Sequence, residues 1–346
     1  MSTRTRLRWT LAGLLAFGCV ASANAPALAQ SPPPPGQVPS QVVIAVDNDD
    51  GGYRPSQKYA AVRARLVKGR ALERLHDFLS FVRLPRKIWV VAAECNGGDD
   101  ASPHYSPDNR AITLCYQFFN VAEKAADVVM AAAEKNPQVL PFPVTRDEFL
   151  WGLLGAVMLH ESGHALFDVL DVPVFGREED AADQFAILVA LQLRPQLAEA
   201  AVKSYAYFWR VMRDPDSGGT KDGNPNQAFS DVHGTPSQRL YNTLCIAYGR
   251  APAEFGKFVA AGWLPQQRAK GCAQEYAQLA SAFAKTIQPF VDQKRMAAVE
   301  GVDWLSPNYG PAQPAAPPNS ISKTSPKGAP SAPDPASAAG PRGKGA

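Results

Sequence analysis

Five consecutive residues, His160-Glu161-Ser162-Gly163-His164, have the types and spacing that could do chemistry. On a helix, residues four apart lie on one face, so His160 and His164 would point the same way and could share one metal ion. Glu161 would lie beside them, within reach of a water molecule on that ion. Two histidines and a glutamate at this spacing are typical of hydrolytic zinc sites. The chain has only 5 histidines, so the motif would rarely arise by chance.

The motif has this meaning only on a helix, and its surroundings predict one. Residues 145–148 read Thr-Arg-Asp-Glu, a capping box that precedes a broad apolar face. The apolar pattern continues past the motif to Leu170, and Pro173 should stop the helix. Gly163 has no side chain, which would let another backbone pass close to the metal. The alternative is a buried polar helix without a metal.

A catalytic zinc ion usually has three protein ligands and an open position for water, so a third ligand is needed. A turn follows the first helix, and residues 177–186 begin a second apolar-periodic helix. Glu179, 15 residues after His164, could reach back to the metal. Asp183 shares its helix face, where it could accept the free N–H of a ligand histidine. Alternatively, Glu178, Glu179 and Asp180 could be present only because acidic residues are favoured at the N-terminus of a helix.

These residues carry a resemblance to known proteins. The H-E-x-x-H motif followed by E-x-x-A-D at 179–183 resembles the gluzincin metallopeptidases, in particular the CAAX prenyl protease/HtpX type. The segments ECN near residue 94 and ITLCYQ near residue 112 add a closer likeness to a bacterial metallopeptidase family that is classed as a domain of unknown function. This likeness covers roughly residues 66–249.

The resemblance implies roles for individual residues. His160, His164 and Glu179 would bind Zn²⁺, Glu161 would be the catalytic base, and Asp183 would hydrogen-bond a ligand histidine. It implies no particular substrate. Unlike the CAAX protease group, this chain has no apolar segment after its N-terminus that would span a membrane.

A second, looser similarity to the CAAX protease/HtpX group lies in residues 230–239. By this resemblance His233 could donate a hydrogen bond to the oxyanion, and Arg239 could hold the cleft or the substrate. A surface turn that leads into a helix over 240–248 is an equal alternative. The polar loop at 213–231 faintly matches a calcium loop, but Pro225 stands where the closing glutamate should be.

Two segments predict a small sheet. Residues 88–93 read as a buried strand and residues 110–115 as a second strand, joined by a polar loop at 96–109, and the two could pair as a hairpin. In zincins an edge strand beside the active helix commonly holds a peptide by main-chain pairing, and by that analogy 110–115 is the candidate. An ordinary interior strand is the alternative. With helical patterns elsewhere, we expect an α+β fold, predominantly helical and zincin-like, with a small sheet beside the H-E-x-x-H helix.

The N-terminal residues predict that the protein is exported. Residues 1–29 have a basic start, a short apolar core and an A-x-A cleavage site, as a signal peptide does. We expect a Pro-rich linker at 30–41, the metallopeptidase domain at 42–305 and a disordered Pro/Ala/Ser-rich tail at 306–346. Removal of the signal leaves 32 basic and 32 acidic residues, and this lack of net positive charge argues against a nucleic-acid partner. The expected location is the periplasm or the medium.

Four cysteines remain after the signal, which in an exported protein suggests two disulfides. We expect the pairs Cys95–Cys115 and Cys245–Cys272, because the two cysteines of each pair are separated by only a short stretch of chain. A four-cysteine metal site lacks the usual C-x-x-C spacing, and four free thiols are the other alternative.

The sequence as a whole predicts an exported zinc metallopeptidase that acts on a peptide or protein. Two further hypotheses stay open. One is a non-catalytic envelope or binding protein whose metal site is structural or vestigial. The other is a zinc amidohydrolase that uses the same residues on cell-wall material.

Overall fold

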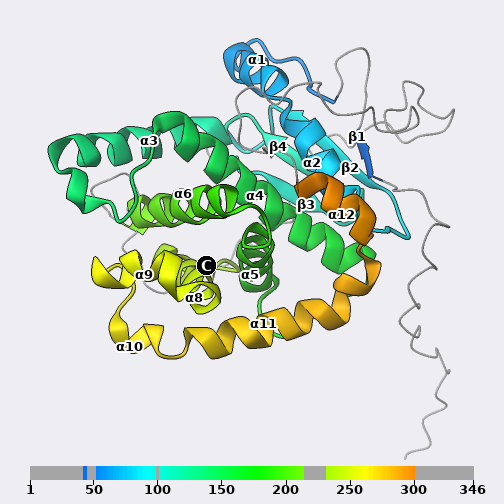
Figure 1. The fold of residues 1–346 in the computed structure, drawn as a ribbon. Helices are drawn as coiled ribbons and strands as arrows, with labels where there is room; N and C mark the ends of the chain where they lie inside the picture. The colour runs from blue at the N-terminus through cyan, green and yellow to red at the C-terminus, as the bar shows by residue number, and fades with distance from the viewer. Residues whose placement is uncertain (1–41, 45–51, 99–100, 214–230, 301–346) are drawn as a thin grey trace, which may run out of the picture. The chain divides into compact units, whose positions relative to one another are not determined.

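The computed structural model describes residues 42–44, 52–98, 101–213 and 231–300 (Figure 1). The predicted signal peptide, the linker at 30–41 and the tail at 306–346 lie outside these residues. In chain order the helices are α1 (Ala60–Lys68), α2 (Ala71–Leu79), α3 (Phe118–Lys135), α4 (Arg146–Val169), α5 (Glu178–Ala190), α6 (Pro195–Arg213), α8 (Pro236–Arg250), α9 (Pro252–Ala260), α10 (Gln266–Ala269), α11 (Cys272–Thr286) and α12 (Gln293–Glu300). The strands are β1 (Val42–Ile44), β2 (Ile88–Ala93), β3 (His104–Ser106) and β4 (Ala111–Cys115).

The four strands form one sheet in the order β1-β2-β4-β3. β1 pairs with β2 in parallel, and β2 pairs with β4 in parallel, with Trp89 opposite Ala111 and Ala93 opposite Cys115. β3 pairs with β4 antiparallel. Both faces of β2 and β4 are largely buried, which explains why their sequences are apolar runs and do not alternate strictly.

The predicted hairpin between residues 88–93 and 110–115 is wrong, because these strands run parallel. The connection between them was expected to be a loop, but it contains β3, and the hairpin is formed by β3 and β4. Its turn closes where the Arg110 N–H donates to the Pro107 carbonyl oxygen, and Arg110 has a φ of 50°. The candidate substrate strand at 110–115 is therefore an interior strand of the sheet, and β3 lies at its edge.

Helix α4 contributes to both hydrophobic clusters of the fold. Leu154, Met158 and Leu166 belong to a cluster with α2 and the sheet, while Phe149 and Leu153 belong to one with α3, α6, α8 and α9. The helix contacts β3 and β4 as well as α5 and α6. The predicted α+β class, predominantly helical with a small sheet beside this helix, is confirmed.

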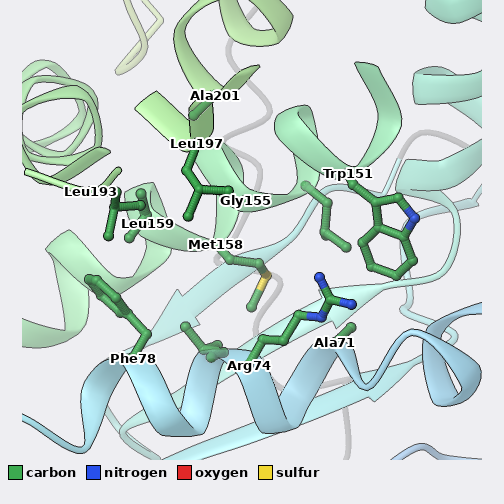
Figure 2. Close-up of a pocket in the computed structure, with 12 residues that line it drawn as sticks. Ala71, Arg74, Phe78, Trp151, Gly155, Met158, Leu159, Leu193, Leu197 and Ala201 are labelled. Carbon is green, nitrogen blue, oxygen red and sulfur yellow. The ribbon is translucent and has the colours of Figure 1, made fainter. Parts of the chain in front are cut away.

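A small apolar cavity of about 80 Å³ lies between α2, α4 and α6 (Figure 2). The guanidinium carbon of Arg74 lies 4.9 Å from the ring centroid of Trp151 at one end of it. On α4 the lining residues recur at the spacing of one helix face, namely Trp151, Leu154, Gly155, Met158 and Leu159. That face is not the one that carries His160 and His164, so the cavity is separate from the predicted metal site.

None of the helices within the described ranges is both long enough and apolar enough to cross a lipid bilayer.

Candidate metal centre

Helix α4 fixes the H-E-x-x-H motif in a buried position. Its first turn is held by the predicted capping box, in which Thr145 accepts from the Glu148 N–H while the Glu148 carboxylate accepts from the Thr145 N–H. Helix α4 runs without a break from there through the motif. His160 and Glu161 are each only 5% exposed. The side chains of the motif are thus carried by a helix and not by a loop.

Helix α5 returns along α4 at close range. The first helix ends where Asp171 takes a left-handed conformation, with φ of 51°, and the Val172 N–H donates to the Phe167 carbonyl oxygen. After the turn, α5 passes the motif at Gly163, where an added Cβ would lie 3.2 Å from the Ala182 Cα. The expectation that Gly163 lets another backbone approach is confirmed. This contact sets the distance between the imidazoles of α4 and the carboxylates of α5.

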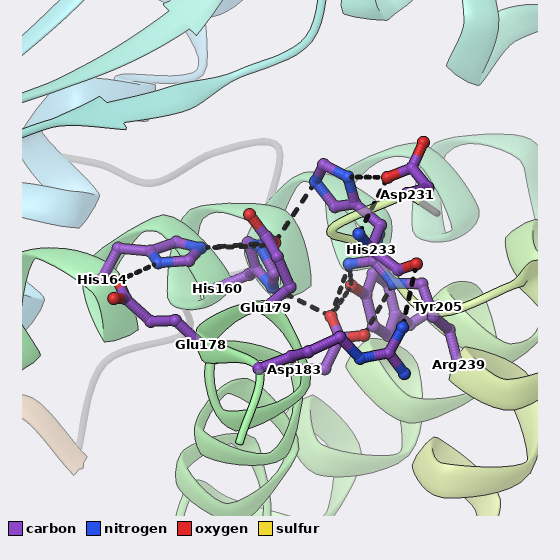
Figure 3. Close-up of polar contacts among 10 residues, drawn as sticks. His160, His164, Glu178, Glu179, Asp183, Tyr205, Asp231, His233 and Arg239 are labelled. Carbon is purple, nitrogen blue, oxygen red and sulfur yellow. Dashed lines mark hydrogen bonds and ion pairs between the residues drawn. The ribbon is translucent and has the colours of Figure 1, made fainter. Parts of the chain in front are cut away.

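Two imidazoles and one carboxylate converge at the α4–α5 contact (Figure 3). The Nε2 atoms of His160 and His164 are 3.2 Å apart, and they lie 3.1 and 3.5 Å from Glu179 Oε2. The three ligand atoms all lie within 4.8 Å of one another. Two imidazole nitrogens and a carboxylate oxygen match the donor set of a catalytic zinc site with one position left for water.

Each of these imidazoles is backed by a further carboxylate. His160 Nδ1 is 2.9 Å from Asp183 Oδ1, and His164 Nδ1 is 2.7 Å from Glu178 Oε1. A hydrogen on Nδ1 that is donated to a carboxylate leaves the Nε2 lone pair directed toward the shared centre, as a metal ligand requires. Asp183 therefore makes the contact with a histidine of the motif that was expected from the sequence. No contact was predicted for Glu178 from the sequence, because its position does not distinguish it from the other acids in the first turn of α5.

The electrostatics of the centre favour a cation. Burial acts to lower the pKa of His160, but the carboxylates of Asp183 and Glu179 outweigh it and raise that pKa to about 9. Burial likewise acts to raise the pKa of Glu179, and its contacts with the imidazoles hold it well below its usual value. The acidic groups thus prefer positive charge between the two helices.

Glu161 has a different environment from the other acids. Burial raises the pKa of its carboxyl group above the usual value, and the nearby His160 and His164 partly offset this. A raised pKa brings a carboxyl group closer to the range in which it can both accept and return a proton near neutral pH.

His233 lies beside the centre, in the segment that precedes α8. Its Nε2 is 3.3 Å from Glu179 Oε2, and its Nδ1 is 3.0 Å from Asp231 Oδ1. The side chain is 47% exposed, in contrast to the buried His160. The structure therefore brings His233 next to the predicted ligand Glu179, at a position that is exposed. Asp231 was not singled out in the sequence as its partner.

Arg239 is buried against Asp183, so it is not placed for the direct substrate contact that the resemblance allowed, and its other implied role, holding the cleft, stays a prediction. The residue is 8% exposed and donates to both oxygens of Asp183, through Nε at 2.6 Å and Nη2 at 2.5 Å. Its guanidinium carbon lies 3.9 Å from the ring centroid of Trp209. Tyr205 also donates to Asp183 Oδ1, at 2.5 Å. No role was assigned to Tyr205 or Trp209 from the sequence.

Both expected disulfides are present, Cys95–Cys115 and Cys245–Cys272. The first joins the ends of the neighbouring strands β2 and β4, and the second joins α8 to α11. His104 lies beside the first pair and Glu275 beside the second, but sulfur atoms in disulfides are not metal ligands. The four-cysteine metal site and the four free thiols are both excluded. Most of the loop considered for calcium, 214–230, lies outside the described residues.

Comparison with known families agrees with this geometry. Residues 53–287 match a family model, DUF4344, whose description reads "Putative metallopeptidase". The match covers most of the chain and all of the residues around the centre, so the chain belongs to this metallopeptidase family. No curated protein and no solved structure gives a match.

Proposed function

We propose that this protein is a zinc-dependent peptidase that hydrolyses peptide bonds in a peptide or protein substrate. His160, His164 and Glu179 would hold the ion. The observation that carries the proposal is the convergence of their three ligand atoms within 4.8 Å, next to a buried glutamate. A zinc ion bound there would supply Lewis-acid activation, which lowers the pKa of a water molecule toward neutrality.

Glu161 is the general base of the proposed reaction. Its carboxylate takes a proton from the attacking water and returns it to the leaving amine, which a carboxyl group of raised pKa can do in turn. His233 supplies a hydrogen-bond donor. With Nδ1–H donated to Asp231, the doubly protonated ring has its Nε2–H to donate to the carbonyl oxygen that gains negative charge.

Strand β3 is the proposed main-chain partner of the substrate. It is at the edge of the sheet, and it contacts α4, so a peptide paired with it would run along the catalytic helix. The same hypothesis was made for residues 110–115 from the sequence. It moves to β3 because β4 is paired on both sides.

The proposed site of action is outside the cytoplasm, in the periplasm or the medium. The two disulfides support this, because disulfides form and persist in oxidising compartments. The signal-like residues 1–29 support it independently.

Glu161→Gln tests the function directly. The mature chain is purified, its zinc content is measured, and hydrolysis of a mixed peptide library is followed with and without chelator. We expect wild type to bind one zinc and to cleave peptides, with activity lost on chelation. Glu161→Gln should keep its zinc and lose on the order of a hundredfold or more in rate.

Glu254→Gln is a suitable control, because Glu254 lies in the first turn of α9, away from the centre. It should match wild type in zinc content and rate. A fully active Glu161→Gln variant would refute the assigned base. A chain that holds zinc but cleaves no peptide would favour the non-catalytic hypothesis, and cleavage of cell-wall amides in place of peptides would favour the amidohydrolase.

A further inference from the structure

We infer that Tyr205 and Arg239 are positioning residues of the metal centre, which act on His160 through Asp183. The inference deepens the proposed function and rests on it, because it assumes that His160 is a metal ligand. It assigns a role to two buried residues that reach the site from α6 and α8.

Asp183 is the hub of a buried network that joins four helices (Figure 3). Its Oδ1 accepts from the Tyr205 hydroxyl at 2.5 Å and from Arg239 Nη2 at 2.5 Å, and it also faces His160 Nδ1 at 2.9 Å. Its Oδ2 accepts from Arg239 Nε at 2.6 Å. Arg239 Nη2 lies a further 2.9 Å from the Tyr205 hydroxyl. Both carboxylate oxygens are therefore held by donors from outside α4 and α5.

These donors leave Asp183 little freedom to rotate. The residue is 4% exposed, and a buried carboxylate is tolerated only when its charge is paired and its oxygens are hydrogen-bonded. The planar guanidinium of Arg239 meets both oxygens at once, an arrangement that a single-point cation such as lysine cannot reproduce. The ring of Trp209 lies against the guanidinium and keeps it in place. The Asp183 carboxylate is thus held in the orientation in which Oδ1 faces His160 Nδ1.

A fixed Asp183 determines which nitrogen of His160 is free. The carboxylate can only accept a hydrogen from Nδ1, so Nε2 keeps its lone pair toward Glu179 and His164. If Asp183 could rotate, the imidazole could also turn or exchange its hydrogen between the two nitrogens. Tyr205 and Arg239 therefore contribute to metal affinity without touching the metal site.

Arg239 also ties the segment of His233 to the same network. It lies in the first turn of α8, directly after a capping box formed by Thr235 and Gln238. An added Cβ on Gly234 would lie 3.5 Å from Arg239 Cγ, so the segment packs against the arginine stem. Arg177, at the start of α5, donates to the His233 carbonyl oxygen at 3.3 Å. Arg239 thus helps to place both His160 and His233.

Two neighbouring tyrosines on α6 provide a matched test. Tyr205 and Tyr207 are each 1% exposed, but the Tyr207 hydroxyl donates to the Phe142 carbonyl oxygen and has no contact with the centre. Zinc affinity of the folded, purified chain is measured by competition with a chromophoric chelator. We expect Tyr205→Phe to weaken zinc binding about tenfold, at the low end of the effect of removing a direct partner of a metal-binding residue, because Tyr205 acts one contact further out. Tyr207→Phe should bind zinc as wild type does, although both variants lose a buried hydrogen bond.

A double-mutant cycle then tests the path through Asp183. In an Asp183→Asn background, Tyr205→Phe should change zinc affinity by less than about twofold, because the group through which it acts has been altered. A tenfold effect that persists in that background would show a route independent of Asp183. Wild-type affinity in a folded Tyr205→Phe variant would overturn the inference. Should that variant not fold, Arg239→Lys replaces it, and unchanged affinity there would overturn the inference equally.

The failure of this inference and that of the proposed function are distinguishable. Zinc-dependent peptide cleavage by wild type together with an unperturbed Tyr205→Phe variant would remove the positioning role and leave the peptidase. Tight zinc binding that depends on Tyr205 and Asp183, with no cleavage of any peptide, would keep the positioning role and remove the peptidase.

Discussion

The hydroxyl of Tyr105 donates to Asp168 Oδ2 at 2.5 Å and so joins the edge strand β3 to the last turn of α4. Arg86 Nη2 donates to the backbone carbonyl oxygen of Asp168 and lies 3.8 Å from its Oδ1. The strand proposed to bind substrate and the helix proposed to do the chemistry are therefore linked by one side-chain contact, outside the metal centre.

Loss of this link should weaken substrate binding more than chemistry. Tyr105→Phe removes the hydroxyl and lets β3 shift relative to α4, so we expect KM for a peptide substrate to rise several-fold, on the order of 1 kcal/mol, with kcat within about twofold of wild type. Steady-state kinetics would measure both constants. Tyr248→Phe, a half-buried residue packed in the other hydrophobic cluster, is the control and should change neither. A fall in kcat with constant KM would contradict the assignment.

Adjacent acids on α5 should differ in their effect on the metal. Glu179 Oε2 faces both Nε2 atoms, while Glu178 contacts only the far nitrogen of His164. We expect Glu179→Gln to lose zinc during dialysis and Glu178→Gln to retain it with about tenfold lower affinity. Zinc content after dialysis and a chelator titration would separate the two. Equal affinities in both variants would mean that the ligand is misassigned.

Gly163 should not tolerate a methyl group. A Cβ there would meet Phe185 Cδ1 at 3.1 Å and the Ala182 Cα at 3.2 Å, so α5 would have to move away from α4. Gly163→Ala is expected to cost about 1–3 kcal/mol in the free energy of unfolding and to weaken zinc binding. Gly256→Ala is the matched control on α9, where an added Cβ meets nothing within 4 Å. It should stabilise the helix by about 0.5–1 kcal/mol. Denaturant unfolding of both variants would check these signs.

The metal-free protein should lose stability in acid through Asp183. Burial acts to raise the pKa of this carboxyl group, but the hydrogen bonds from His160 and Arg239 and the charge of Arg239 hold it well below its usual value. A depressed pKa in the folded state stabilises the protein above the unfolded pKa of about 3.9, and that stabilisation is lost as the pH falls toward the folded value. Urea unfolding with chelator present, from pH 6 to below about pH 4, should show this loss. Asp183→Asn should be less stable at neutral pH and show a shallower pH dependence.

Reduction of the disulfides should destabilise the fold. They span 20 and 27 residues, for which loop-closure entropy predicts about 3 kcal/mol each. Thermal unfolding with and without a thiol reductant would measure the sum, and Cys95→Ser/Cys115→Ser would isolate the first bond. A melting temperature unaffected by reduction would contradict this expectation.

The parts of the centre that follow from helical spacing could be predicted from the sequence. Thr145 and Glu148 fix where α4 begins, four-residue spacing puts His160 and His164 on one face, and the same spacing puts Glu179 and Asp183 on one face of α5. The disulfide pairs followed from their short separations.

The parts that depend on contacts between distant segments could not be predicted. The order of the strands is one case, because residues 88–93 and 110–115 are compatible with either direction of pairing and the short β3 has no apolar signature. Arg239 is another. A loose resemblance of residues 230–239 suggested that it holds the cleft or the substrate, but the approach of α8 to α5 buries it against Asp183. Tyr205 carried no signal beyond its aromatic character.

The bond between Cys95 and Cys115 closes the base of the excursion that carries β3. In a reducing compartment this bond would stay open, and strand pairing with β4 would then have to hold β3 without it. In an oxidising compartment the bond would close and hold β3, the proposed main-chain partner of a substrate, against the sheet.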